Sequence, residues 1–285
     1  MLSVTVLAFV LGLPPTEFPH EKTGTFQRTF DFDASGPPEI EIDNVQGSIE
    51  LVGYDGASVQ LAVRESFRAR SQERLDLAQQ QVKLLVSQEE NRLRLYVDGP
   101  FRRGDGSNRY RGPEDYGYEV TFGFALRVPR HTNLVLKTIN DGEIRVDAVS
   151  GIFDVKNVNG GISITNASGS GRAYAVNGDV SVVFAENPAA ASYFGSLNGD
   201  VSAVFEADLS ARLMVKTFNG DLYTDFPTTY LRELPPIDLA QRHGKKVYES
   251  SGYYGLQVGA GGPPIELDAF NGDIRVLKRG LAGRR

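Results

Sequence analysis

The chain of 285 residues contains no cysteine, no tryptophan and only three histidines. The absence of cysteine excludes disulfides, thiolate zinc sites, iron–sulfur clusters, a cysteine nucleophile and a lipid-modified N-terminal cysteine. His20, His131 and His243 are widely separated and lack metal-ligand spacing, which argues against zinc chemistry and against a Ser-His-Asp triad. Phosphate loops and dinucleotide fingerprints are also missing. We therefore expect no cofactor and no catalytic residue.

An excess of positive charge is also missing. The sequence has 30 basic and 36 acidic residues, a formal charge of −6 and a pI of about 5.2. A protein that binds a phosphate backbone usually carries a basic patch or stripe. We therefore expect no nucleic-acid partner.

Long hydrophobic runs are absent except at the N-terminus. Residues Leu2–Leu13 are almost wholly apolar and end at Pro14 and Pro15, but a membrane-spanning helix takes about 20 residues. The length suits the apolar core of a secretory signal. We expect residues 1–24 to be a signal segment and linker, and the protein to be exported to the periplasm or cell surface, with membrane association open. A buried N-terminal strand and a mis-chosen start codon are the alternatives.

An internal repeat is the main positive signal. The pattern apolar-Asn-Gly-Asp-apolar occurs four times, and weaker copies begin at Val158, Ile139 and Val45. Successive asparagines are 18 to 21 residues apart until a longer gap before the last copy. Alternating apolar and polar residues flank each turn, which is the period of a half-buried strand. The turn motif consists of Asn159, Gly160, Asn177, Gly178, Asn198, Gly199, Asn219, Gly220, Asn271 and Gly272.

Two all-β architectures can use this repeat. Asn-Gly is a strong signal for a two-residue β-hairpin, so an antiparallel hairpin stack is one possibility. The nearly constant period favours the other, a right-handed parallel β-solenoid with coils of 18–21 residues, in which identical turns stack in register. Glycine would supply positive φ at each corner, and asparagine side chains would form a ladder that bonds corner or neighbouring backbone groups.

Stacking also predicts the core. The apolar residues before Asn and those two positions after Gly would form two internal ladders. Phe218 is expected to be buried between Leu197 and the last coil. The first ladder contains Ile139, Val158, Val176, Leu197, Phe218 and Phe270, and the second contains Ile144, Ile162, Val180, Val201, Leu222 and Ile274.

The aspartates of the repeat need an offsetting interaction. In-register coils about 4.8 Å apart would stack Asp179, Asp200 and Asp221 as like charges, which is destabilising. Exposure to water, a bond to a backbone N–H, or a bound cation would relieve this repulsion. The three aspartates are thus candidate metal ligands, although the spacing of the calcium-binding nonapeptide repeat is missing.

The rest of the chain is assigned to the same domain. We expect strands and one short helix, residues 70–81, within 25–130, regular coils over 131–279 with an insertion at 227–262, and a disordered tail at 280–285. The arginine- and tyrosine-containing loop 98–118 could bind an anionic chain. Insertions in repeat proteins gather on one face, often the binding face.

The repeats, with Phe30-Asp31-Phe32 and the run Gly47–Asp55, resemble the bacterial putative-adhesin family of β-strand repeat domains. The resemblance covers about residues 26–279 and implies an exported, envelope-associated protein with a β-helical body. It carries no catalytic residues over to this chain.

Two functions follow as hypotheses. The first is a non-enzymatic, envelope-associated surface binding, adhesin-like or structural module, with glycans or envelope proteins as partners and an open oligomeric state. The alternative is a polysaccharide lyase or hydrolase, because parallel β-helices host such enzymes with paired carboxylates. A row of aspartates repeated at each turn favours the first, because a catalytic acid and base need different environments.

Overall fold

The computed structural model describes residues 17–32, 36–102, 113–231, 241–242, 245–246 and 253–280. The apolar segment Leu2–Leu13 lies outside these residues, as do residues 103–112 of the loop expected at 98–118 and the tail after Gly280. Of the insertion expected at 227–262, residues 232–240, 243–244 and 247–252 lie outside them. β1 begins at His20, inside the segment expected to be a linker.

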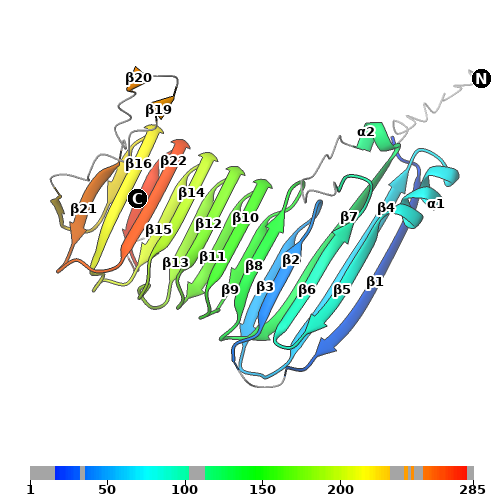
Figure 1. Cartoon of the computed structure of the whole chain (residues 1–285), viewed down its shortest axis with the longest axis horizontal. Coiled ribbons are helices and arrows are strands. Elements are labelled where there is room, and N and C mark those ends of the chain that lie inside the picture. Colours follow the sequence, from blue (N-terminus) through cyan, green and yellow to red (C-terminus); the bar gives the residue numbers. More distant parts are fainter. Residues whose placement is uncertain are drawn as a thin grey trace, which may run out of the picture.

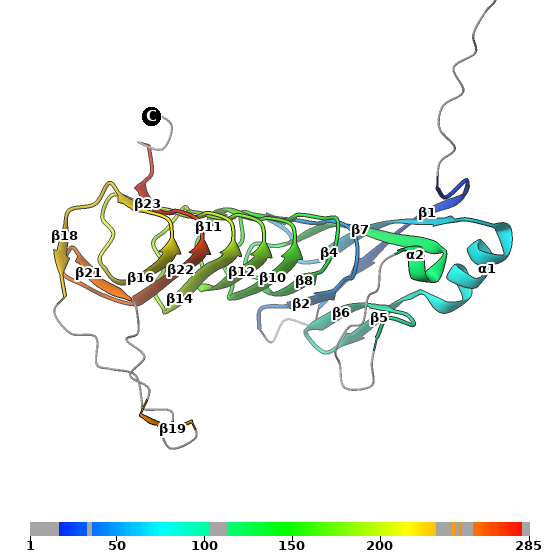
Figure 2. The same cartoon turned by 90° about the horizontal axis from the view of Figure 1, so that it is seen from above.

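Two large sheets pack against each other with the core between them, as the two layers in Figure 2 show. They do not close onto each other, and each contains parallel and antiparallel pairs. The order in sheet A is β1 (His20–Phe30), β4 (Val59–Ala69), β7 (Tyr118–Pro129), β3 (Ile49–Tyr54), β9 (Ile144–Asp147), β11 (Ile162–Ala167), β13 (Val180–Phe184), β15 (Val201–Phe205), β23 (Ile274–Lys278) and β17 (Leu222–Thr224).

Sheet B lies on the other side of the core. Its order is β18 (Thr228–Tyr230), β21 (Tyr254–Val258), β16 (Ala211–Asn219), β22 (Pro264–Asn271), β14 (Ser192–Asn198), β12 (Gly171–Asn177), β10 (Phe153–Asn159), β8 (Asn133–Thr138), β2 (Glu39–Asp43), β6 (Arg92–Asp98) and β5 (Lys83–Glu89). β19 (Gln241–Arg242) and β20 (Lys245–Lys246) pair only with each other.

Each repeat gives one strand to each sheet. β12 ends at Asn177 in sheet B and β13 begins at Val180 in sheet A, so Asn-Gly turns a corner between the sheets. Strands of successive repeats then pair in parallel, as β10, β12 and β14 do. The prediction of an all-β chain is confirmed, and these corners are not the hairpin turns of an antiparallel stack. We call one such pair of strands with its corner a coil.

The spatial order of the coils departs from the sequence order at the C-terminal end. The coil β22/β23, last in the sequence, lies between β14/β15 and β16/β17 (Figure 1). Phe218 therefore neighbours Phe270, and the expected position of Phe218 between Leu197 and the last coil is wrong.

A glycine-rich crossing makes this order possible. β21 pairs with one edge of β16 and β22 with the other, so residues 259–263 must pass the start of β16. Gly259 and Gly261 have φ of 59° and 80°, values that favour glycine. The Ser210 hydroxyl accepts from the Ala260 N–H at 3.0 Å and donates to the Gly261 carbonyl at 2.8 Å, which holds the crossing in place.

The core uses only one of the two expected ladders. Residues two positions after the repeat Gly are buried, except the half-buried Leu222. The residues before Asn point outward, and Leu197, Phe270 and Phe218 are 38%, 44% and 70% exposed. The inward positions are instead two residues before Asn, where Ala175 and Ser196 lie.

The N-terminal part extends both sheets. The degenerate copy at Val45 forms the corner between β2 and β3, and Gln46 bridges to Asn140 in the place of an asparagine. The predicted helix is α1 (Gln72–Gln81), which begins at Gln72 because the Ser71 side chain accepts from the Arg74 N–H. Leu75 and Ala78 of α1 are buried. The short helix α2 (Pro113–Tyr116) was not predicted. None of the described helices is long and apolar enough to cross a membrane.

Candidate functional site

Asparagine side chains form a continuous ladder along the corners of the stack. Asn177 Nδ2 donates to Asn159 Oδ1 at 2.8 Å, and Asn198 donates to Asn177 in the same way. The side chains bond one another rather than backbone groups. The ladder runs in the order Asn140, Asn159, Asn177, Asn198, Asn271 and Asn219, with N···O distances of 2.7–2.8 Å.

The repeat glycines allow the corners to approach closely. A Cβ on Gly178 would lie 2.4 Å from the Gly160 carbonyl oxygen, and one on Gly199 would lie 2.4 Å from that of Gly178. Such contacts are far inside van der Waals distance, so a side chain there would push adjacent coils apart. Close backbone approach requires these glycines. The expected positive φ is found at Gly160, Gly178 and Gly199 but not at Gly220 or Gly272, so it is not shared by every corner.

The aspartates form a second ladder, but Asp221 does not neighbour Asp200. Asp179 Oδ1 accepts the N–H of Asp200 at 2.8 Å, Asp200 accepts that of Asp273 at 2.9 Å, and Asp273 accepts that of Asp221 at 3.0 Å. Arg275 pairs with Asp200 at 2.5 Å and with Asp273 at 2.7 Å. Backbone N–H groups and one guanidinium thus offset the repulsion.

Arg275 also controls the ionisation of Asp200. Partial burial pushes the pKa of Asp200 upward, but the hydrogen bond from Arg275, the Asp273 amide and the charge of Arg275 outweigh it and lower the pKa below its usual value. The carboxylates proposed as metal ligands are therefore engaged by groups of the chain. The described residues contain no cluster of three or more histidine, cysteine, aspartate or glutamate side chains that could hold a metal ion.

The loop arginine that lies within the described residues has a structural role. Arg102 Nη1 pairs with Asp43 at 2.9 Å, and its guanidinium stacks over the Tyr96 ring at 4.3 Å. The Arg102 side chain is 5% exposed, so it is not available to an anionic ligand.

The outer face of sheet B carries a group of aromatic side chains that the sequence analysis missed. The Tyr193 ring lies flat over Gly195, where an added Cβ would come within 2.6 Å of the Tyr193 hydroxyl. The Tyr174 ring is its neighbour, with centroids 6.4 Å apart. The Arg172 guanidinium lies 4.3 Å from the centre of the Tyr193 ring. Together they form a polar aromatic surface across β12 and β14.

Two carboxylates flank this surface on β22. Glu266 and Asp268 both accept a hydrogen bond from the Tyr253 hydroxyl, the latter at 3.3 Å, and neither pairs with a cation among the described residues. Lys216 Nζ lies 5.4 Å from the centre of the Tyr253 ring. Burial, aided by the charge of Asp268, raises the pKa of Tyr193 to about 12. We call Arg172, Tyr174, Tyr193, Tyr253, Glu266 and Asp268 the tyrosine platform.

A shallow groove of about 440 Å³ adjoins the platform. It crosses β10, β12, β14, β22 and β16, so its direction follows the long axis of the stack. Five strands at a spacing of about 4.8 Å place the outer two roughly 19 Å apart. Arg172, Tyr193 and Glu266 belong to both the platform and the groove. Asp154 and Met214 line the groove alone. The arrangement offers flat rings, carboxylates and a guanidinium to an elongated ligand.

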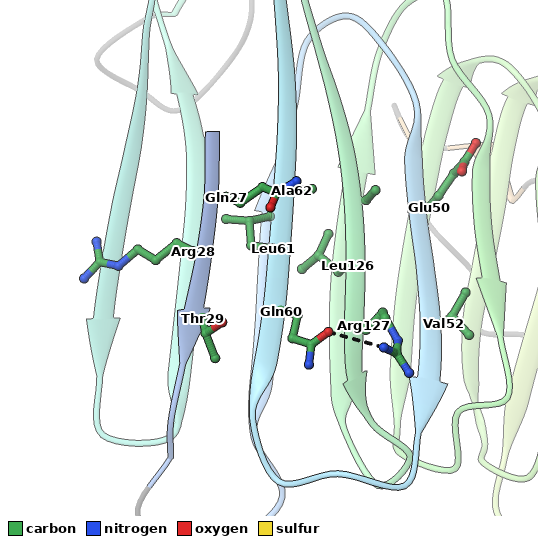
Figure 3. Close-up of a pocket in the computed structure, with 11 residues that line it drawn as sticks. Gln27, Arg28, Thr29, Glu50, Val52, Gln60, Leu61, Ala62, Leu126 and Arg127 are labelled. Carbon is green, nitrogen blue, oxygen red and sulfur yellow. Dashed lines mark hydrogen bonds between the residues drawn. The ribbon is translucent and has the colours of Figure 1, made fainter. Parts of the chain in front are cut away.

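A second groove of about 550 Å³ lies on the outer face of sheet A (Figure 3). Its lining comes from β1, β4, β7 and β3. Figure 3 shows the Gln60 and Arg127 side chains directed toward each other, with Nη1 and Oε1 3.4 Å apart, and Arg28 pointing away from Arg127. The grooves are on opposite faces of the molecule, because the core separates the sheets.

The sequence could have signalled part of the platform. Tyr174 and Tyr193 stand three and five residues before their repeat asparagines, and Glu266 and Asp268 stand five and three before Asn271. In-register coils place these positions in two adjacent rows. The sequence does not show that β22 pairs with β14, and this pairing places the two carboxylates beside Tyr193.

Comparisons with known proteins give little further information. No family model matches the chain, and no curated protein matches its sequence. A structure described as a putative cell adhesion protein from Clostridium sporogenes ATCC 15579 is similar to it with a TM-score of 0.45 at 11% identity, covering 90% of this chain and all of that one. A putative lipid binding protein from Parabacteroides distasonis ATCC 8503 gives a TM-score of 0.23 at 12% identity, covering 89% and 96%. Likenesses this remote identify neither a fold nor a function.

Proposed function

We propose that this chain is an exported, non-enzymatic binding module of the adhesin type, built as a right-handed parallel β-solenoid, whose tyrosine platform binds glycans at the cell envelope. The handedness is supported by the connections: β10, β11 and β12 leave one sheet and return to it in parallel, and such crossovers are right-handed in about 98% of cases. Export is supported by the apolar segment Leu2–Leu13.

The observation that carries the binding proposal is that tyrosine rings lie next to two carboxylates beside the groove, and that neither carboxylate forms an ion pair among the described residues. The apolar C–H face of a sugar packs well on an aromatic ring, whereas its hydroxyls need polar partners. Glu266 and Asp268 accept hydrogen bonds, and charge-assisted hydrogen bonds are the stronger ones. Tyr253 fixes both carboxylates, so little side-chain entropy is lost when a ligand binds.

The elongated shape of the groove favours a polymer over a single sugar. A ligand that lies across several strands contacts equivalent rows of successive coils, because neighbouring strands keep the same register. Successive sugar units of an extended glycan chain can therefore make equivalent contacts with successive coils.

Affinity electrophoresis of the purified protein in gels that contain neutral xylan, mannan or β-glucan tests this proposal. We expect retardation in at least one gel and a loss of about tenfold or more in affinity, an order of magnitude in Kd, for Tyr174→Ala. Tyr223→Ala is the matched control, because Tyr223 is a tyrosine that is 39% exposed and lies on sheet A, away from the platform. Equal retardation of both variants would exclude the platform as the site.

The enzyme alternative is tested in the same preparation. Release of reducing ends or unsaturated products from these polymers, abolished by Glu266→Gln, would show a lyase or hydrolase. Glu266 and Asp268 share one hydroxyl donor, so their environments are alike, whereas a catalytic acid and base need different ones. We expect binding without cleavage.

A further inference from the structure

The groove on sheet A has a chemistry unlike that of the tyrosine platform. Strand register places Gln27, Ala62, Ala125 and Glu50 side by side in one row across β1, β4, β7 and β3. Ala62 and Ala125 provide a floor of two methyl groups, with an amide at one end and a carboxylate at the other. The next row, Thr29, Gln60, Arg127 and Val52, forms one side of the groove.

Arg127 is the cation that faces this floor. Its guanidinium lies 4.6 Å from the centre of the Tyr54 ring and donates only a long hydrogen bond of 3.4 Å to Gln60. It forms no ion pair with any carboxylate of the described residues. The ring and the amide hold the guanidinium in place while leaving N–H donors for another partner.

The one acidic side chain that lines the groove is already engaged. Glu50 pairs with Arg145 at 3.3 Å, and Arg145 also bonds Glu143. Arg28 also lines the groove, but its side chain points away from Arg127, and its guanidinium lies 4.7 Å from the centre of the Phe30 ring (Figure 3). The charge that faces the methyl floor is therefore that of Arg127. A planar guanidinium recognises a carboxylate by two parallel hydrogen bonds.

A peptide strand finds no backbone partner over the methyl floor, and of the four strands that line the groove only β1 has an unpaired edge. β4, β7 and β3 are each paired on both sides, so their N–H and C=O groups are used within the sheet. Recognition must come from side chains. Besides Arg28 and the engaged Glu50, the polar ones are two glutamine amides, a threonine hydroxyl and the Arg127 guanidinium around methyl groups. Amides and hydroxyls suit a ring with several hydroxyls, and the methyl floor suits its C–H face.

We propose that the sheet A groove is a second binding site, which takes a hexuronate unit of an acidic polysaccharide with its carboxylate on Arg127 and its ring over Ala62 and Ala125. This site is independent of the tyrosine platform and lies on the opposite face. A chain with both sites joins an acidic polymer to a second glycan.

Isothermal titration of the full-length protein with sodium polygalacturonate tests the proposal. We expect binding that is at least about tenfold weaker for Arg127→Gln and intermediate for Arg127→Lys, which keeps the charge but loses the planar fork. Ala62→Leu should also weaken binding, because it fills the floor at constant charge. The matched control is Arg64→Gln, which removes the same charge from an exposed side chain of β4 that does not line this groove.

Each contrary result overturns the assignment. Equal losses for Arg64→Gln and Arg127→Gln would mean diffuse attraction between charges. Competition by poly-glutamate at equal potency would mean that the ligand is an acidic peptide. Dextran bound as well as polygalacturonate would exclude recognition of the carboxylate, and no binding of polygalacturonate would exclude the site. Tyr174→Ala, which tests the platform, should leave polygalacturonate binding unchanged. All the changed side chains are on the surface, so every variant should melt at the temperature of the parent. Unaltered melting excludes misfolding as the cause of weaker binding.

Discussion

Tyr193 lies flat against the backbone of Gly195, and this half-buried position controls how its phenol titrates. Burial, with Asp268 nearby, raises its pKa to about 12 from the usual 10. Because the folded pKa is the higher one, the neutral phenol contributes stability that is complete below pH 10. That contribution is lost as the pH rises from about 10 to 12.

NMR titration of ring-labelled tyrosine should therefore show resonances with a pKa near 12 for Tyr118 and Tyr193, of which the Tyr193 resonance disappears in Tyr193→Phe. The same variant should lose less stability than the parent between pH 10 and 12. Asp268→Asn should lower the pKa of Tyr193 by removing a negative charge. A Tyr193 phenol that titrates at 10 would mean that the ring stands free in water.

Phenylalanines on the two sides of sheet B differ in what they contribute to stability. Phe194 is fully buried, stacks on Phe153 and packs at a tilt against Phe184, whereas Phe218 is 70% exposed. We expect Phe194→Ala to reduce the free energy of unfolding by about 3–5 kcal/mol, the usual cost of a large core truncation. Phe218→Ala, which loses its stacking with Phe270, should cost about 1 kcal/mol or less. Urea unfolding of both variants measures the difference, and a larger loss for Phe218→Ala would restore the expected buried position.

At the scale of single elements, the asparagine ladder makes position within the row a determinant of stability. Asn198 bonds both Asn177 and Asn271, whereas Asn219 at the end bonds only Asn271. Each bond contributes about 0.5–1.5 kcal/mol. Asn198→Ala should therefore lower the free energy of unfolding about twice as much as Asn219→Ala. Chemical denaturation of the two variants checks this ratio, and equal losses would mean that the ladder bonds contribute nothing measurable.

The corner motif was predictable from the sequence, but which residues of the preceding strand point into the core was not. Alternation and the constant spacing predicted strands that meet at Asn-Gly, and these strands are present. The rule that apolar residues lie inside assigned Val176 and Phe218 to the inner face of their strands, whereas both lie on the outer face. The inward residue at this strand end lies beside a corner carbonyl, so several coils place a hydrogen-bond donor there. Thr138 bonds Gly47, Asn157 bonds Gly142 and Gly161, Ser196 bonds Gly178, and Thr217 bonds Gly272.

At the scale of the whole molecule, identical corners explain why coil order could not be predicted. Asn198 can bond any asparagine that stacks on it, and Asn219 and Asn271 belong to the same motif. The choice depends on the crossing by residues 259–263, whose length and glycine content allow β22 to pass β16. Local patterns carry no information about that choice, and the groove on sheet B could not be located without it.

The absence of natural cysteine makes the order of coils directly measurable. Asn198 and Asn271 are partners on adjacent parallel strands, which lie about 4.8 Å apart. This suits a disulfide, whose Cα atoms are usually 4.4–6.8 Å apart. Asn198→Cys with Asn271→Cys should form a disulfide within the chain. Asn198→Cys with Asn219→Cys, separated by a whole strand, should not. Mass spectrometry of the oxidised proteins reads out both, and a reversed result would restore the sequence order of coils.

The interleaved coil β22/β23 connects two coils that do not contact each other through paired strands. In an ordinary repeat array, loss of the final unit shortens the array and leaves the other contacts untouched. Here, removal of residues 264–278 takes away the layer that joins β16/β17 to the rest, because β14 and β16 each pair with β22. A nascent chain cannot complete this end of the stack before residues 264–278 have been made. Proteolytic removal of these residues would thus separate the coil β16/β17 from β14/β15 rather than remove one end coil.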